Sequence, residues 1–99
     1  MPFGWFDARE AIDFGVALAR FYMERCPREA APAKDKRKGR KMEVLDKMAL
    51  QVAQFRQSRK MNVYKKARFG NAFRWALVDA GYESAEADEL TNFLLLRFG

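Results

Sequence analysis

The side chains that most often carry chemistry are scarce in this chain. Among its 99 residues there is no histidine and a single cysteine, Cys26. Zinc and copper sites, and nucleophiles activated by a histidine base, are usually built from imidazole and thiolate groups, so one chain of this composition supplies neither. The segment Gly39-Arg40-Lys41 lacks the preceding glycine and the following hydroxyl residue of a phosphate-binding loop. We therefore predict a protein that is not an enzyme, and we infer no metal, cofactor or small-molecule substrate.

The main carboxylate cluster lies near the C-terminal end, at Glu83, Glu86, Asp88 and Glu89. Oxygen ligands of this kind suit a hard cation such as Ca²⁺. The cluster also begins a predicted helix, where acidic side chains interact favourably with the helix dipole. The second explanation is the simpler one, and we predict no metal site there.

Positive charge is concentrated in the middle of the chain. The net charge is +6 overall, but residues 27–60 hold eleven basic and four acidic residues, which gives +7 for that segment. Flexible lysine and arginine side chains bind phosphates by releasing counterions. The same side chains could also be merely solvated, or could contact an acidic protein. The alternative function that we keep open is a small nucleic-acid- or polyanion-binding protein that uses Lys36, Arg37, Lys38, Arg40, Lys41, Arg56, Arg59, Lys60, Lys65 and Lys66.

The stretch from residue 63 to residue 81 is a helix that is apolar on two sides. At about 100° per residue, Phe69, Phe73 and Leu77 fall on one side. The opposite side holds Tyr64, Trp75 and Val78, and charges occupy the edges, with Arg68 and Asp79 on one of them. A helix of this kind must be covered on both sides, either within its own bundle or by a second molecule.

The last helix, predicted to start after Ser84, has the same surplus of apolar residues, because Leu95 and Leu96 point away from its main stripe. Unplaced apolar groups of this size often mark interfaces. We therefore predict a non-catalytic helical-bundle interaction module that docks apolar helix faces onto itself, as a homo-oligomer, or onto a protein partner. The predicted interface residues are Tyr64, Trp75, Val78, Leu95 and Leu96.

These residues need a small all-α scaffold to position them. A first helix is predicted after Asp7, with small residues on one face that allow another helix to approach closely: Ala11, Gly15 and Ala19. Residues 27–40 contain prolines and a glycine but no large apolar residue, which predicts a flexible basic linker. A second helix follows, with a stripe that includes Met42, Leu45, Met48 and Val52. Capping signals at Asn62 and Gly81 then bound the third helix. We predict one domain over residues 1–99, a four-helix bundle.

Hydropathy gives an expectation about location. No segment approaches the ~20 consecutive apolar residues of a membrane span. The start of the chain, MPFGWF, lacks the basic residues and the apolar run of a secretory signal. A single cysteine allows no internal disulfide bond. The sequence therefore predicts no membrane span and a cytoplasmic protein.

Overall fold

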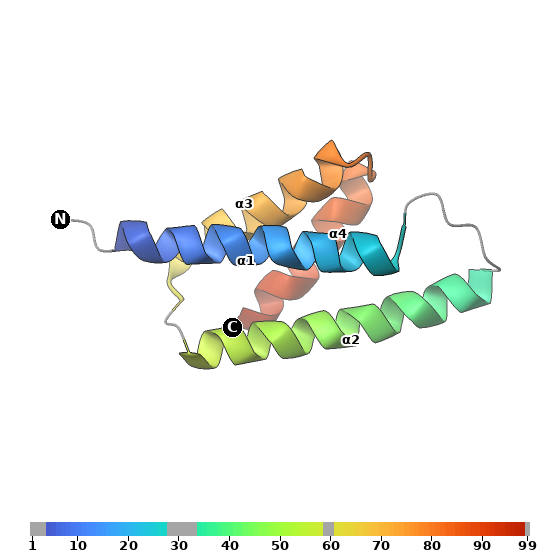
Figure 1. The fold of residues 1–99 in the computed structure, drawn as a ribbon, viewed down its shortest axis with the longest axis horizontal. Coiled ribbons are helices and arrows are strands. Elements are labelled where there is room, and N and C mark those ends of the chain that lie inside the picture. The colour runs from blue at the N-terminus through green and yellow to red at the C-terminus, as the bar shows by residue number, and fades with distance from the viewer. Residues whose placement is uncertain (1–3, 28–33, 59–60, 99) are drawn as a thin grey trace.

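The prediction of an all-α, four-helix fold is confirmed. The computed structural model describes residues 4–27, 34–58 and 61–98, and within these ranges the side chains of residues 8–27, 39–58 and 61–98. These residues contain helices and no strand (Figure 1): α1 (Gly4–Arg25), α2 (Lys34–Ser58), α3 (Val63–Asp79) and α4 (Ser84–Phe98).

The helices form an elongated, flat body with extents of 52 × 25 × 18 Å. α1 packs most extensively along α3, and α3 packs on α4. α2 packs on α4 and, to a smaller extent, on α1. In Figure 1, α1 and α2 run in opposite directions across the view, while α3 and α4 lie behind α1 and the C-terminal end of α4 reaches α2. This order leaves one side of α3 without a helix over it.

The contact between α1 and α3 is as close as the small residues of α1 predict. A Cβ atom built on Gly15 would lie 2.6 Å from the carbonyl oxygen of Phe69 and 3.2 Å from the backbone nitrogen of Phe73. Ala11 and Ala19, on the same face of α1, are fully buried. The backbones of the two helices therefore touch at Gly15, and this contact fixes α3 in the bundle.

Aromatic residues make up much of the core beneath this contact. Phe69 and Phe73 of α3 are fully buried, as the sequence predicts. The ring of Phe69 lies edge-on to Phe98 of α4, with 4.9 Å between the ring centres. Phe14 of α1 stacks on Phe55 of α2 at 4.3 Å, which joins the second helix to the first. Offset and edge-to-face aromatic pairs of this kind add to the stabilisation from burial alone.

The C-terminal end of α1 is tied to the turn between α3 and α4 by two tyrosine hydroxyls. Tyr22 donates to the carboxylate of Glu86 at 2.5 Å, and Tyr82 donates to the backbone carbonyl of Cys26 at 2.8 Å. Burial, with the Glu86 carboxylate as a smaller contribution, raises the pKa of Tyr22 well above its usual value of 10.0. Tyr22 therefore stays a neutral hydrogen-bond donor over the whole physiological range.

Both predicted ends of α3 are confirmed. The side chain of Asn62 accepts the backbone N–H of Lys65 at 2.8 Å, as an N-cap residue does. At the other end Gly81 adopts a φ of 98°, and the N–H groups of Gly81 and Tyr82 bond to the carbonyls of Val78 and Leu77. This pair of bonds is the Schellman motif, which favours glycine because of the positive φ.

The starts of the other helices differ from the predictions. α1 begins at Gly4, so Asp7 lies inside the helix instead of capping it. An aspartate such as Asp7 can cap a helix only where the residues before it are not helical, and here residues 4–6 already belong to α1. α2 begins at Lys34, so residues 34–40 of the predicted 27–40 linker are helical, and residues 28–33 lie outside the described residues. Lysine and arginine are good helix formers, and a helix end that projects beyond the core needs no apolar stripe.

Smaller differences concern single positions in α2 and α4. Met42 is 60% exposed, whereas the sequence places it on the buried stripe of α2. Val44 is buried instead. α4 begins at Ser84, and the N–H of Ala87 bonds to the carbonyl of Glu83, which places the start of the first turn one residue before the predicted N-cap.

Candidate interaction surface

One side of α3 faces solvent along its whole length. Its residues recur at intervals of three, four or seven, so they lie within an arc of about 80° around the helix axis. All are exposed, although the opposite side of the same helix holds its buried residues, Phe69, Phe73 and Leu77 among them. We call this surface the outer stripe of α3, and define it by Tyr64, Arg68, Asn71, Trp75 and Asp79.

The aromatic members of the outer stripe are large and accessible. Tyr64 is 48% exposed and Trp75 is 50% exposed. They lie eleven residues apart, or about 16 Å along the axis at ~1.5 Å per residue. Val78, which the sequence places with them, is half-buried at the edge of the stripe and packs against the core.

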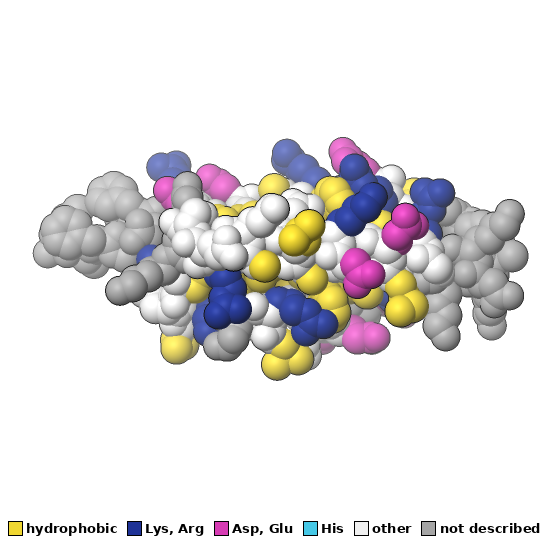
Figure 2. Space-filling model, turned by 90° about the horizontal axis from the view of Figure 1, so that it is seen from below, with side chains coloured by type: hydrophobic (Ala, Val, Ile, Leu, Met, Phe, Trp, Pro, Cys, Tyr) yellow, Lys and Arg dark blue, Asp and Glu magenta, His cyan; other side chains and the backbone are white. Residues whose placement is uncertain are grey.

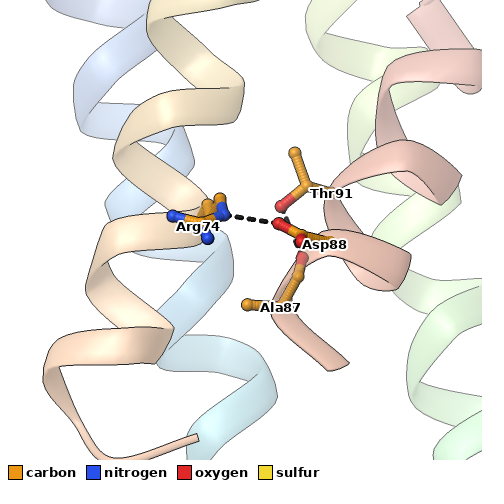
Figure 3. Close-up of polar contacts among 4 residues, drawn as sticks. All are labelled: Arg74, Ala87, Asp88 and Thr91. Atoms are coloured by element: carbon orange, nitrogen blue, oxygen red, sulfur yellow. Dashed lines mark hydrogen bonds and ion pairs between the residues drawn. The ribbon is translucent and has the colours of Figure 1, made fainter. Parts of the chain in front are cut away.

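The side chain of Trp75 is held in place from the side that faces α4. Arg74 forms an ion pair with Asp88 of α4, and its guanidinium carbon lies 5.2 Å from the centre of the Trp75 ring. Figure 3 shows Arg74 reaching across from α3 to Asp88, beside the hydroxyl of Thr91 that bonds to the carbonyl of Ala87. Because a cation over an aromatic face is attractive, this arrangement restricts the motion of the exposed indole ring.

A shallow groove separates the outer stripe from α4. It is open to solvent and has a volume of about 380 Å³. A Cβ atom on Gly70 would lie 3.3 Å from the Thr91 methyl group and 3.4 Å from Leu95, so side chains of α4 come close to the backbone of α3 at its floor. The groove is lined by Ala67, Gly70, Asn71, Arg74, Asp88, Thr91, Asn92 and Leu95.

The structure brings together only part of the predicted interface. Tyr64 and Trp75 share the outer stripe, and Val78 borders it. Leu95 is half-buried in the groove. Leu96 is 75% exposed, but it lies about 100° around α4 from Leu95 and does not line the groove. The sequence places Arg68 and Asp79 at the edge of the helix without giving them a role, yet both lie in the outer stripe.

The face of the molecule that holds α2 has a different character. Figure 2 views the molecule from the side on which α2 lies in Figure 1, and hydrophobic side chains appear there as separate patches among Lys, Arg, Asp and Glu. Two large apolar side chains of α2, Met42 and Leu50, are about 60% exposed. Scattered single apolar residues are normal on protein surfaces and indicate no interface.

The residues of the alternative polyanion-binding prediction are spread out. Arg40 and Arg56 are exposed, but they lie about 24 Å apart along α2 and about 160° apart around it. Lys41 and Lys66 are half-buried, and Lys65 is only 8% exposed. The remaining predicted residues lie outside the described side chains: Lys36, Arg37, Lys38, Arg59 and Lys60.

Two of the carboxylates near the start of α4, Glu86 and Asp88, have partners of their own. Glu86 accepts the hydroxyl of Tyr22, and Asp88 pairs with Arg74. Over the described ranges, no three His, Cys, Asp or Glu residues are grouped so that they could hold a metal ion. The interactions seen here therefore agree with a role of these acidic side chains in packing α4 against α1 and α3.

Comparison with known proteins gives no indication of function. Family models, curated proteins and solved structures give no significant match to the chain. None of the helices, over the residues that the structure describes, is long and apolar enough to cross a membrane. Among the described residues, exposed aromatic and charged side chains are lined up on the outer stripe of α3.

Proposed function

We propose that the chain is a non-catalytic interaction module that docks onto protein through the outer stripe of α3. The observation that carries this proposal is the exposure of Trp75, half of whose surface faces solvent on a helix whose other side packs into the core. Of the predicted interface residues, Tyr64, Trp75 and Val78 belong to the proposed docking surface, and Leu96 does not.

The composition of the stripe supports docking. Tryptophan, tyrosine and arginine are the residues that most often dominate the free energy of binding at protein interfaces. The exposed half of Trp75 offers on the order of 100 Å² of apolar surface, and covering it would contribute about 2–3 kcal/mol to binding. Because Arg74 already contacts the indole ring, less side-chain entropy is lost when a partner covers it.

Site-specific photocrosslinking in cells that express the chain tests the proposal. A photoreactive phenylalanine analogue is placed at Tyr64 or at Trp75, and as a control at Gln54, which is exposed on α2. We expect discrete crosslinked products from the two α3 positions and none from Gln54. Equal yields at all three positions, or no product at any of them, would contradict docking through this surface.

A second candidate function rests on charge. The net charge of +7 over residues 27–60, with Arg40 and Arg56 exposed, supports binding of nucleic acid or another polyanion. Titration with a nucleic acid at two salt concentrations tests it. We expect binding at low salt that weakens steeply as salt rises, and absence of binding at low salt would exclude this candidate.

A further inference from the structure

We propose that the partner of the outer stripe is a second copy of this chain, docked antiparallel to the first around a twofold axis. This inference rests on the proposed function and names its partner. It comes from the order of side chains along α3, where Arg68 and Asp79 flank Trp75 on a single stripe of the helix.

The stripe is self-complementary when it is reversed. Arg68 and Asp79 are eleven residues apart, which is about 16 Å of helix and about 20° of rotation. In an antiparallel pair of α3 helices, Arg68 of each copy can lie opposite Asp79 of the other, so two ion pairs form at once. A twofold interface repeats every contact in this way.

The same register brings the tryptophans together. The midpoint between Arg68 and Asp79 falls between Phe73 and Arg74, one to two residues from Trp75. The two indole rings therefore lie within a turn of the twofold axis, near the centre of the interface. Residues that dominate binding energy usually occupy this central position, where the surrounding contacts exclude water.

The charges of the stripe also disfavour a parallel pair of α3 helices. Parallel α3 helices would place Arg68 beside Arg68 and Asp79 beside Asp79, and like charges brought together at an interface oppose binding. Within the described part of the chain, Arg68 and Asp79 form no ion pair of their own, although they are exposed. Both are therefore available to a second molecule.

The size of the stripe sets the strength of the dimer. α3 has 17 residues and is about 25 Å long, and packed helices lie about 8–10 Å apart. Two such helices cover an area at or below the low end of stable interfaces, about 1,200 Å² in total. We therefore infer a reversible dimer whose population depends on concentration, not a permanent one.

Sedimentation equilibrium on the full chain, from about 10 μM to about 1 mM, tests the inference, because weak interfaces associate in this range. We expect Arg68→Glu and Asp79→Lys each to weaken self-association about tenfold. The double variant, with both charges exchanged, should return to within about threefold of the parent chain. Positions 68 and 79 are too far apart to pair within one chain, so such a recovery can arise only between copies.

Two further variants separate the contributions. Trp75→Ala should weaken the dimer by at least about thirtyfold, since two central rings are lost. Lys47→Glu, a charge reversal at an exposed position of α2, should leave it unchanged. Raising the salt concentration should weaken the parent dimer, because the ion pairs are exposed and therefore screened. Far-UV circular dichroism of each variant is the check that it is folded.

Two results would overturn the inference: a parent chain that stays monomeric to about 1 mM, or a double variant that associates no better than either single variant. If the chain is monomeric but a residue at the Trp75 position crosslinks to another protein, the second copy is excluded as partner and the proposed function stands. If the chain is monomeric and neither α3 position crosslinks, both are excluded.

Discussion

Substitution of Gly15 by alanine tests the contact that holds α3 in the bundle. The added Cβ atom would lie 2.6 Å from the carbonyl oxygen of Phe69, about 0.8 Å closer than an ordinary contact at 3.4 Å. The obstructing atom belongs to the backbone of α3, so no side-chain rotation can relieve the clash. The two helices must move apart along the contact that buries Ala11 and Ala19.

The expected magnitude follows from two opposing terms. Alanine is a better helix former than glycine by about 1 kcal/mol. Forcing extra atoms into a closely packed interface typically costs about 1–3 kcal/mol, and a backbone obstruction belongs at the upper end of that range. We therefore expect Gly15→Ala to lower the free energy of unfolding by about 2 kcal/mol, and the Tm by about 10 °C.

Two other glycines of the same helical bundle serve as controls. A Cβ atom on Gly39 in α2 meets nothing within 4 Å, so Gly39→Ala should show only the gain in helix propensity, about 1 kcal/mol of stabilisation. A Cβ atom on Gly70 meets the ends of the Thr91 and Leu95 side chains at 3.3–3.5 Å, which can shift slightly, so Gly70→Ala should lie between the two.

Urea unfolding of the parent and the three variants, followed by far-UV circular dichroism, gives the comparison. Since all three glycines lie in helices, propensity alone would stabilise every variant by a similar amount. A Gly15→Ala variant as stable as Gly39→Ala would show that the backbones of α1 and α3 are not in close contact at Gly15.

Three further predictions follow from hydrogen bonds and helix ends. Tyr22→Phe removes the hydroxyl that bonds to Glu86 and should lower the free energy of unfolding by about 1–2 kcal/mol in urea at pH 7. Burial, and to a smaller extent Glu86, raises the pKa of Tyr22, so the unfolded chain loses the Tyr22 proton at a lower pH than the folded chain does. The free energy of unfolding should therefore fall as the pH rises above 10.0, and it should fall less in Tyr22→Phe. An equal fall in both chains would contradict this. Asn62→Ala leaves the N–H of Lys65 without its cap and should cost about 1 kcal/mol in the same urea assay, whereas Asn62→Asp should cost little. Gly81→Ala places a Cβ atom at a φ of 98° and should cost about 1–2 kcal/mol, and a neutral result by thermal unfolding would show that the turn relaxes.

The features predicted correctly from the sequence are those decided by local chemistry. Asn62 and Gly81 bound α3 because a capping side chain and a positive φ act over one turn of helix. Helical periodicity likewise gives the buried side of α3, with Phe69 and Phe73 at its centre. The closeness allowed by Gly15 also follows from residue size, although the sequence does not say which helix approaches.

The features predicted wrongly depend on what lies beyond one helical turn. Asp7 resembles a cap only if the chain leaves the helix before it, and nothing local decides that. The start of α2 at Lys34 carries no apolar signal, because that end of the helix extends beyond the other helices (Figure 1). Met42 and Val44 exchange places because the buried side of α2 is set by the helices packed against it, which the periodicity of one helix does not reveal.

For the candidate surface too, the local pattern was predicted correctly and the effect of neighbouring helices was not. Periodicity separates Tyr64 and Trp75 from the core side of α3, which agrees with their exposure. It does not reveal how far a neighbouring helix covers the edge, so Val78 and Leu95 prove half-buried and Leu96 faces another direction. The importance of Arg68 and Asp79 emerges only when their shared stripe is seen to be uncovered.

The placement of α2 determines which part of the molecule should unfold first. Within the described residues α2 packs on α4 and little on α1, and no direct backbone contact joins it to α3. The backbone contact at Gly15 and the hydroxyl bonds of Tyr22 and Tyr82 hold the other three helices together independently of it. Partial unfolding should therefore begin with α2, and its amide hydrogens should exchange with solvent through an opening that leaves those of α1, α3 and α4 protected.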